Sequence, residues 1–344
     1  MTSRVSAAFF ALLRSGLGLA SLELDGWWPL SEKEWHEVHA LAGKHTVLGV
    51  VFDGMEGLPA GEGRIPMPLF AKWALEVEDT VKSWRLQHAI VKAQKAVWEK
   101  RGMKAAVLKG QTVAAMYPHP ERRTSGDIDW WFGDESDWRT ANEIAAANAG
   151  SLTEDSDGDV HYVFKGEVIE HHRRWNDASS RKARKALAGL SPDTPVAVLV
   201  MLELHILKHA MVFGVGLRQV CDLVMAYRWF EGKYEASELE GLLERCGLGK
   251  WDLLLNGLLR RVFGDGALPE HVKPGLKVAD KDVEKLFALV MADGNFGLEA
   301  GRRTENLLRT LLQRAGLFVR YTPREFAGRL MRLAFGRLIR KKKI

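Results

Sequence analysis

Two aspartates separated by one isoleucine, Asp127 and Asp129, are the residues of this sequence best suited to chemistry. They lie in a β-strand expected over Asp127 to Phe132, which Trp130, Trp131 and Phe132 make strongly β-forming. Because successive side chains of a strand alternate between its faces, both carboxylates are expected on the same face. Like charges so placed repel each other unless a cation lies between them, and magnesium prefers carboxylate and phosphate oxygens. The spacing therefore predicts a metal-binding strand, although the same pattern in isolation also fits an exposed surface pair.

A turn upstream of this strand has the features of a phosphate site. Residues 104–108 are expected to form a short strand, followed by a turn at Gly110 and the start of a helix, whose unbonded N–H groups favour anions. Lys109 beside the turn and Arg123 shortly before the metal strand are placed where a phosphate needs cations, and Gln111 follows the glycine. The alternative for both cations is ordinary surface charge.

A third carboxylate is expected from a β-hairpin over residues 160–172, whose arms meet at a Lys-Gly turn. On its second arm Glu170 and His172 share one face. If that arm lies beside the predicted metal strand, Glu170 completes a cluster with Asp127 and Asp129. The alternative is a hairpin carboxylate that is simply exposed.

These residues resemble the nucleotidyltransferase superfamily, to which DNA polymerase β and the aminoglycoside nucleotidyltransferases belong. The resemblance is to a bacterial branch in which a Lys-Gly turn replaces the usual Gly-Gly or Gly-Ser. The matching residues are Leu108, Lys109, Gly110, Tyr117, Pro118, Arg123, Asp127 and Asp129. The branch also has a third acidic residue just before a histidine, which Glu170 matches. Further on it has a helix with spaced histidines and a following aspartate, which His205, His209 and Asp222 could supply. The match is specific over roughly 104–175 and weaker over 195–225.

The resemblance implies transfer of a nucleoside monophosphate from a nucleoside triphosphate to a hydroxyl acceptor, with release of pyrophosphate and dependence on magnesium or manganese. The expected metal ligands and catalytic residues are Asp127, Asp129 and Glu170. The candidate nucleotide-binding residues are Lys109, Gly110, Gln111, Arg123 and Lys208. One departure from the superfamily is Gln111, which stands where a serine commonly touches the triphosphate. The gap between Gly110 and Asp127 is also longer than in compact members.

Two other functions remain open. A nucleotide-binding pseudoenzyme or interaction module would keep the fold without transfer, which Gln111 favours and the intact carboxylates oppose. A toxin of the same superfamily would modify nucleic acids. The acceptor is open among a sugar, a small molecule, a peptide, a protein side chain and an RNA end. His205 and His209, four residues apart on one helix face, have a spacing that can bind zinc. No third ligand accompanies them, so a structural or cleft-lining role is favoured.

The composition is that of a soluble globular protein of two or three domains. The chain has 344 residues, 47% hydrophobic and 27% charged, and both fractions are ordinary for such proteins. Its two cysteines, Cys221 and Cys246, form no metal-type pair, which argues against a disulfide scaffold and fits a reducing compartment. We therefore expect a cytoplasmic protein.

The net charge of +5 is unevenly distributed. Residues 301–344 contain 13 Lys and Arg against 2 Glu, so this segment carries +11 and the remainder −6. This charge predicts an anionic partner for the basic helix expected over 322–344: a nucleic acid, a membrane surface or an anionic acceptor. The alternative is a solvated helix face. No uncharged apolar run approaches the ~18 residues of a spanning helix, so no transmembrane segment is expected. The apolar N-terminal patch is interpreted as a helix, not a signal peptide.

The fold class predicted to position these residues is α+β, with a small mixed β-sheet nucleotidyltransferase core between helical regions. The expected division is an N-terminal helical region, 1–70, the core, 71–185, and a C-terminal helical domain, 186–344, ending in the basic helix. In the N-terminal region, Ser31 and Glu34 form a predicted capping box. A long helix is expected over 69–102.

Overall fold

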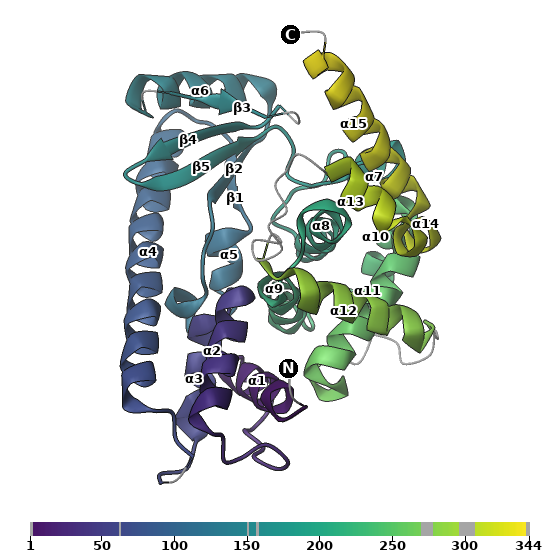
Figure 1. The fold of residues 1–344 in the computed structure, drawn as a ribbon. Coiled ribbons are helices and arrows are strands. Elements are labelled where there is room, and N and C mark those ends of the chain that lie inside the picture. The colour runs from purple at the N-terminus through teal and green to yellow at the C-terminus, as the bar shows by residue number, and fades with distance from the viewer. Residues whose placement is uncertain are drawn as a thin grey trace.

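A computed structural model describes residues 3–61, 63–149, 151–155, 158–269, 278–295 and 307–341. It has an α+β fold in which a small mixed sheet lies between helical regions (Figure 1). The predicted fold class is therefore confirmed.

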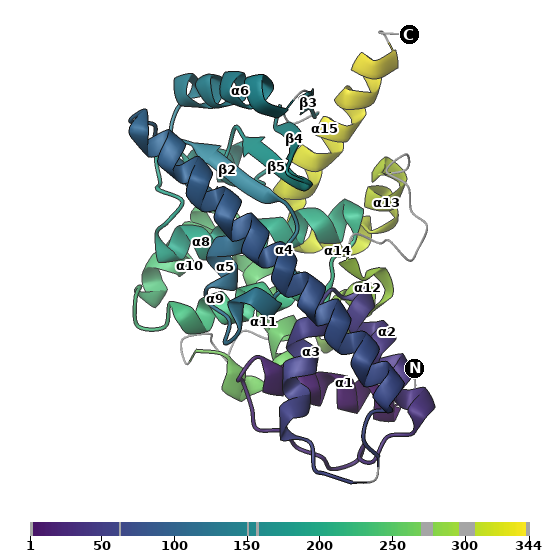
Figure 2. The same cartoon turned by 90° about the vertical axis from the view of Figure 1, so that its left-hand side faces the viewer.

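The N-terminal helices form one end of the molecule and lead into a long helix. These elements are α1 (Ser3–Gly16), α2 (Glu32–Lys44), α3 (Leu48–Gly54), the 3-10 turn Met55–Gly57 and α4 (Met67–Lys100). The predicted capping box at α2 is confirmed, because Glu34 N donates to Ser31 Oγ and Ser31 N donates to the Glu34 carboxylate. Helix α4 runs from these helices across one face of the sheet (Figure 2). It is 34 residues long and lies close to its predicted bounds.

Five short strands make up the sheet. They are β1 (Ala105–Leu108), β2 (Ile128–Phe132), β3 (Thr153–Glu154), β4 (Val160–Phe164) and β5 (Glu167–His172). Their order is β1-β2-β5-β4-β3, with β2 and β5 parallel and the other neighbours antiparallel. The predicted hairpin is confirmed as β4–β5, with Lys165 and Gly166 both at positive φ, as a tight two-residue turn requires. The second arm lies beside β2, so the condition for a three-carboxylate cluster is met.

One face of the sheet is apolar and covered by α4 and α6 (Glu135–Ala149). Ile128, Trp130 and Phe132 of β2 point into a core shared with both helices. Trp98 of α4 packs edge-to-face on Trp130 and Phe132, with ring centroids 6.2 and 5.6 Å apart. Because side chains alternate along β2, burying these residues leaves Asp129 on the opposite face.

Helices cover the opposite face too. They are α5 (Gly110–Ala114), α8 (Pro195–Lys208) with its π-helical continuation His209–Phe213, and α9 (Leu217–Trp229). Both views place α8 and α9 on the side of the sheet away from α4 (Figures 1 and 2). Among the described helices only Pro195–Phe213 is long and apolar enough to cross a membrane, and 78% of its most apolar window is buried inside the protein.

The rest of the C-terminal region is helical. Its elements are α7 (Arg181–Leu187), α10 (Ala236–Cys246), α11 (Gly249–Phe263), the 3-10 turn Asp265–Ala267, α12 (Asp280–Asp293), α13 (Leu307–Gln313), α14 (Ala315–Tyr321) and α15 (Pro323–Lys341). One apolar core joins N-terminal and C-terminal helices, from Val5 to Phe326, and the predicted boundary at residue 70 lies inside α4. The domain division stays a prediction.

Two sequence features fall in this region. Cys221 and Cys246 are buried free thiols. Within α15, Arg329 is buried, at 4% exposure, whereas the side chains of 335–344 lie outside the described part of the chain. An anionic partner for 322–344 therefore remains an expectation from the sequence.

Candidate functional site

The three predicted carboxylates converge on one face of the sheet. Asp129 and Glu170 are direct neighbours in the register of the parallel strands β2 and β5. Asp127 lies one residue before β2, half-buried, and its carboxyl hydrogen-bonds that of Glu170. The strand spacing and the hairpin together produce this convergence.

Crowding of negative charge shows in the pKa of Asp127. Burial raises that pKa to about 7 from its usual 3.8, and the charges of Asp129 and Glu170 add to the effect. Near neutral pH the Asp127 carboxyl is thus only partly ionised, and its protonated form can donate the hydrogen bond to Glu170. A cluster of this kind has an excess of negative charge that a bound cation would neutralise.

Asp129 is ionised because two cations surround it. Burial alone would raise the pKa of its carboxyl, but the Lys109 ammonium, 3.3 Å from Oδ1, and a hydrogen bond from His172 lower it. Nε2 of His172 lies 2.6 Å from Asp129 Oδ1, and its Nδ1 lies 2.9 Å from Asp159 Oδ2. Burial lowers the pKa of His172, yet these two hydrogen bonds outweigh it and bring the pKa to about 9.

Glu170 has a similar partner on the neighbouring strand. Nδ1 of His161 lies 2.8 Å from Glu170 Oε1, and the ring also faces Asp155. Hydrogen bonds to these two carboxylates raise the pKa of His161 to about 10. Burial raises the pKa of Glu170, but the hydrogen bond from His161 outweighs it, so the pKa is lowered.

The donor atoms suit a divalent cation. Ligand atoms of Asp129, Glu170 and His172 all lie within 4.8 Å of one another, and the Asp127 carboxyl adjoins Glu170. Carboxylate oxygens suit magnesium, and the His172 imidazole would add a ligand that manganese also accepts only after losing the proton that it holds between Asp129 and Asp159. The residues present therefore fit the metal ion that the sequence implied, with His172 as a fourth candidate ligand.

The raised pKa of Asp127 makes stability depend on pH when no metal ion is bound. The folded protein binds this proton more tightly than the unfolded chain, so its stabilising effect is present below pH 3.8 and lost as pH rises through about 7. Asp127→Asn removes the effect. With a metal chelator present, we expect the melting temperature of the variant minus that of wild type to increase as pH rises from 5 to 8. A difference independent of pH would contradict the shared proton.

The turn before α5 directs Lys109 toward the carboxylates and Gln111 toward α4. Lys109 adopts positive φ, which is uncommon for a residue with a side chain, and its ammonium faces Asp129. Gln111 instead donates to Oε1 of Gln87, a buried residue in the middle of α4. The Gln87 amide nitrogen in turn donates to Gly126 O and to Glu167, so α4 holds the residue that precedes Asp127.

Arg123 is held in a buried ion pair. Its Nε and Nη2 atoms each lie 2.7 Å from one oxygen of Asp222, and Tyr117 donates to the same carboxylate at 2.7 Å. Arg123 also lines the cavity described below, so contact with a phosphate stays a prediction. Asp222 nevertheless occupies the Nε and Nη2 edge of the Arg123 guanidinium.

Lys208 has a comparable partner, Asp177. Nζ of Lys208 and Nδ1 of His205 lie 2.7 and 3.0 Å from the two Asp177 oxygens. The rings of His205 and His209 are 4.4 Å apart. Within the described ranges neither histidine belongs to a cluster of three metal-ligating side chains, and both line the cavity. The cleft-lining interpretation of these histidines is confirmed.

A cavity of about 350 Å³ lies between the carboxylates and helices α8 and α9, within the usual size range of small-molecule sites. Its charged and histidine lining comprises Lys109, Arg123, Asp127, Asp129, Asp155, His161, Glu170, His172, His205, Lys208, His209, Arg218 and Asp222. Every charged residue predicted for the site from the sequence therefore lines one space.

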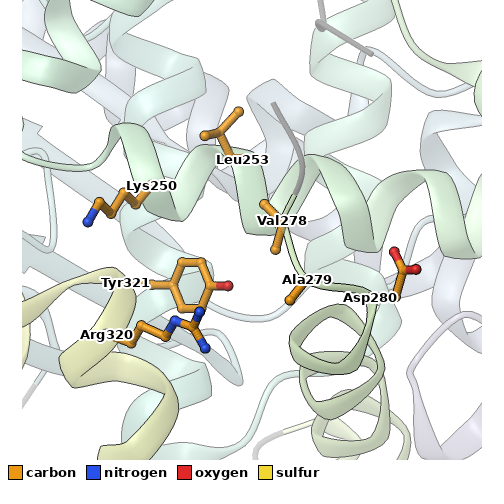
Figure 3. Close-up of a pocket in the computed structure, with 7 residues that line it drawn as sticks. All are labelled: Lys250, Leu253, Val278, Ala279, Asp280, Arg320 and Tyr321. Atoms are coloured by element: carbon orange, nitrogen blue, oxygen red, sulfur yellow. The ribbon is translucent and has the colours of Figure 1, made fainter. Parts of the chain in front are cut away.

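A second cavity, of about 590 Å³, lies between α11, α12 and α14 (Figure 3). Arg320 and Tyr321 of α14 face Lys250 and Leu253 of α11 across it. Arg320 and Tyr321 are bonded to Asp282, at 2.8 and 2.9 Å. No metal-ligating cluster lies there among the residues described, so the smaller cavity is the candidate site.

Several residues of the site have no role assigned from the sequence. His172 is on the expected face, but nothing in the sequence reveals that its ring bonds Asp129. His161 follows from the hairpin register, which sets it opposite Glu170. Asp177 and Arg218 come from segments that only tertiary packing brings to the sheet, and no motif singles them out.

The sequence matches the model of a protein family described as an uncharacterised nucleotidyltransferase, over residues 31–264. Comparisons with curated proteins and with solved structures gave no match. The family match covers more than half of the chain and includes the whole carboxylate cluster. This chain therefore belongs to the family of uncharacterised nucleotidyltransferases.

Proposed function

We propose that this protein is a magnesium-dependent nucleotidyltransferase that moves a nucleoside monophosphate from a nucleoside triphosphate to an acceptor hydroxyl. The observation that carries the proposal is the cluster of Asp127, Asp129 and Glu170 beside a cavity lined with cations, in a chain of this family. Like charges are brought together here and raise the pKa of Asp127, which fits a site for a cation and a polyphosphate.

The metal ion would be held by Asp127, Asp129 and Glu170. When bound, magnesium neutralises phosphate oxygens and makes the acceptor hydroxyl more acidic. Lys109 and His172 keep Asp129 ionised and fix its orientation. The other work of the chain is to position the reactants and to exclude water, which is where enzymes of this chemistry obtain much of their rate.

In the proposed reaction the acceptor oxygen forms a bond to the α-phosphorus and the bond from that phosphorus to the bridging oxygen breaks. Pyrophosphate leaves with the electron pair of the broken bond. The proton of the acceptor hydroxyl is taken up by Glu170, which lies on the cavity side of the sheet. Helices α8 and α9 form the opposite wall, so their residues would select the acceptor.

The test is a nucleotide-binding and pyrophosphate-release screen with ATP, GTP, CTP and UTP, with and without magnesium. We expect at least one triphosphate to bind only when magnesium is present. Binding without turnover in the presence of candidate acceptors would indicate a pseudoenzyme or an acceptor not yet supplied. Absence of binding under every condition would contradict the proposal and favour an interaction module.

A further inference from the structure

Four residues with permanent positive charge line the candidate cavity, and three of them are already neutralised. Lys109 lies 3.3 Å from Asp129. Arg123 and Lys208 are each 2.7 Å from a carboxylate, that of Asp222 and that of Asp177 respectively. These three cations therefore balance the protein's own anions before any ligand arrives.

Arg218 of α9 is the fourth cation, and its surroundings differ. It is 8% exposed, and its Nη1 donates to the backbone oxygen of Thr124 at 3.1 Å. The Nε atom is buried and has no hydrogen-bond partner. Among the described residues no carboxylate lies within ion-pair distance of this guanidinium.

A buried guanidinium that makes no ion pair is energetically costly. A second positive charge lies nearby and adds to this cost, because Arg123 donates to the same backbone oxygen of Thr124. Burial and the charge of Arg123 lower the pKa of Arg218, and the more distant charges of Asp222 and Asp127 only partly offset this. Asp222, one turn along the same helix, directs both of its oxygens to Arg123. The guanidinium of Arg218 thus keeps hydrogen-bonding capacity that no described carboxylate uses.

The position of Arg218 indicates where such a ligand would lie. A side-chain carbon placed at Gly126 would be 3.8 and 3.9 Å from Nη1 and Nη2 of Arg218. Gly126 directly precedes Asp127, so the guanidinium reaches the same end of the cavity as the carboxylates. An anion bound by Arg218 would therefore lie next to the proposed metal site.

We propose that Arg218 binds the polyphosphate of the donor nucleotide, because among the described Lys and Arg residues of the cavity it is the one without an ion pair. The inference rests on the proposed function for the identity of the anion. A planar guanidinium can donate two parallel hydrogen bonds to phosphate oxygens, which an ammonium cannot do. Arg218 is a binding residue in this assignment, and Arg123 orders α9 through Asp222.

The test compares wild type with Arg218→Gln and Arg218→Lys, and uses Arg228→Gln, an exposed arginine on the same helix, as the control. Calorimetric titrations are made with ATP, ADP, AMP and adenosine in magnesium, and with inorganic tripolyphosphate in chelator. We expect Arg218→Gln to bind ATP about 10- to 100-fold more weakly, as loss of hydrogen bonds to a charged group predicts. Adenosine binding should be unchanged, Arg218→Lys should recover part of the loss, and Arg228→Gln should match wild type.

Thermal unfolding without ligand separates binding from a structural role. Removal of a buried charge that makes no ion pair should leave the melting temperature of Arg218→Gln equal to or above that of wild type. A large fall would assign Arg218 to folding and overturn the inference. Equal ATP affinity in wild type and Arg218→Gln would also overturn it, while the proposed function would stand.

Failure of the proposed function has a different signature. Wild type would then show no magnesium-dependent nucleotide binding. Tripolyphosphate binding that is lost in Arg218→Gln would still support an anion site at this residue. If neither ligand bound wild type, both proposals would fall.

Discussion

Replacing Asp127 and Asp129 together by asparagine is expected to abolish metal-dependent nucleotide binding while the protein remains folded. Asparagine keeps the shape of each side chain and removes the charge that a divalent cation requires. The affinity for manganese, followed by electron paramagnetic resonance, should fall by at least about 100-fold, the upper end of the effect of removing a group that only supports a metal ligand. ATP binding in magnesium should be lost in parallel, and transfer should be lost once an acceptor is identified.

Glu143→Gln provides the matched control for this variant. Glu143 is exposed on α6, which covers the opposite face of the same sheet, so its charge is remote from the cavity. The control should bind manganese and ATP as wild type does. If the double asparagine variant retained manganese binding, the carboxylate cluster would not be the metal site.

Arg123→Met is expected to destabilise the protein by about 3–5 kcal/mol, because it leaves the Asp222 carboxylate buried without its partner. Both side chains are nearly inaccessible, at 5% and 8% exposure, and the pair joins α9 to the segment before β2. Such a loss is a large part of the ~5–15 kcal/mol that stabilises a typical domain. Urea denaturation measures it as a lower midpoint with little change in slope.

Two further variants check the cause. Arg139→Met breaks an exposed pair with Glu135 on one helix and should cost about 0.5 kcal/mol or less. Arg123→Met/Asp222→Leu removes both charges and should recover much of the lost stability. A small effect of Arg123→Met alone would mean that the guanidinium is available to a ligand, as the sequence resemblance implied.

The parts of the site that were predictable depend on short-range patterns. The period of two along a strand places Asp127 and Asp129 together, and the Lys165-Gly166 turn predicts the hairpin that carries Glu170. The capping box at Ser31 is similarly local. In each case a few neighbouring residues determine the geometry, so the sequence alone was sufficient.

The remaining parts depend on how helices dock on the sheet. The partner of Arg123 lies 99 residues away, and the sequence of α9 does not show which of its turns meets the loop before β2. For the same reason the sequence predicts a phosphate contact or a surface charge for Arg123 and no ion pair with Asp222, and it does not single out Arg218. Both assignments need the relative positions of α9 and the sheet, which no local pattern contains.

Helix α4 also couples the stability of the N-terminal core to that of the core beneath the sheet. Its first turns, with Trp73, pack into the core of the N-terminal helices, and its last turns, with Trp98, pack beneath the sheet. A helix deprived of tertiary contacts is only marginally stable in water, so melting of either core removes support from the other. Gln87, midway between them, is bonded to the residue before Asp127. We therefore expect unfolding to be cooperative across α4, and weakening of the N-terminal core to disturb the carboxylates at a distance.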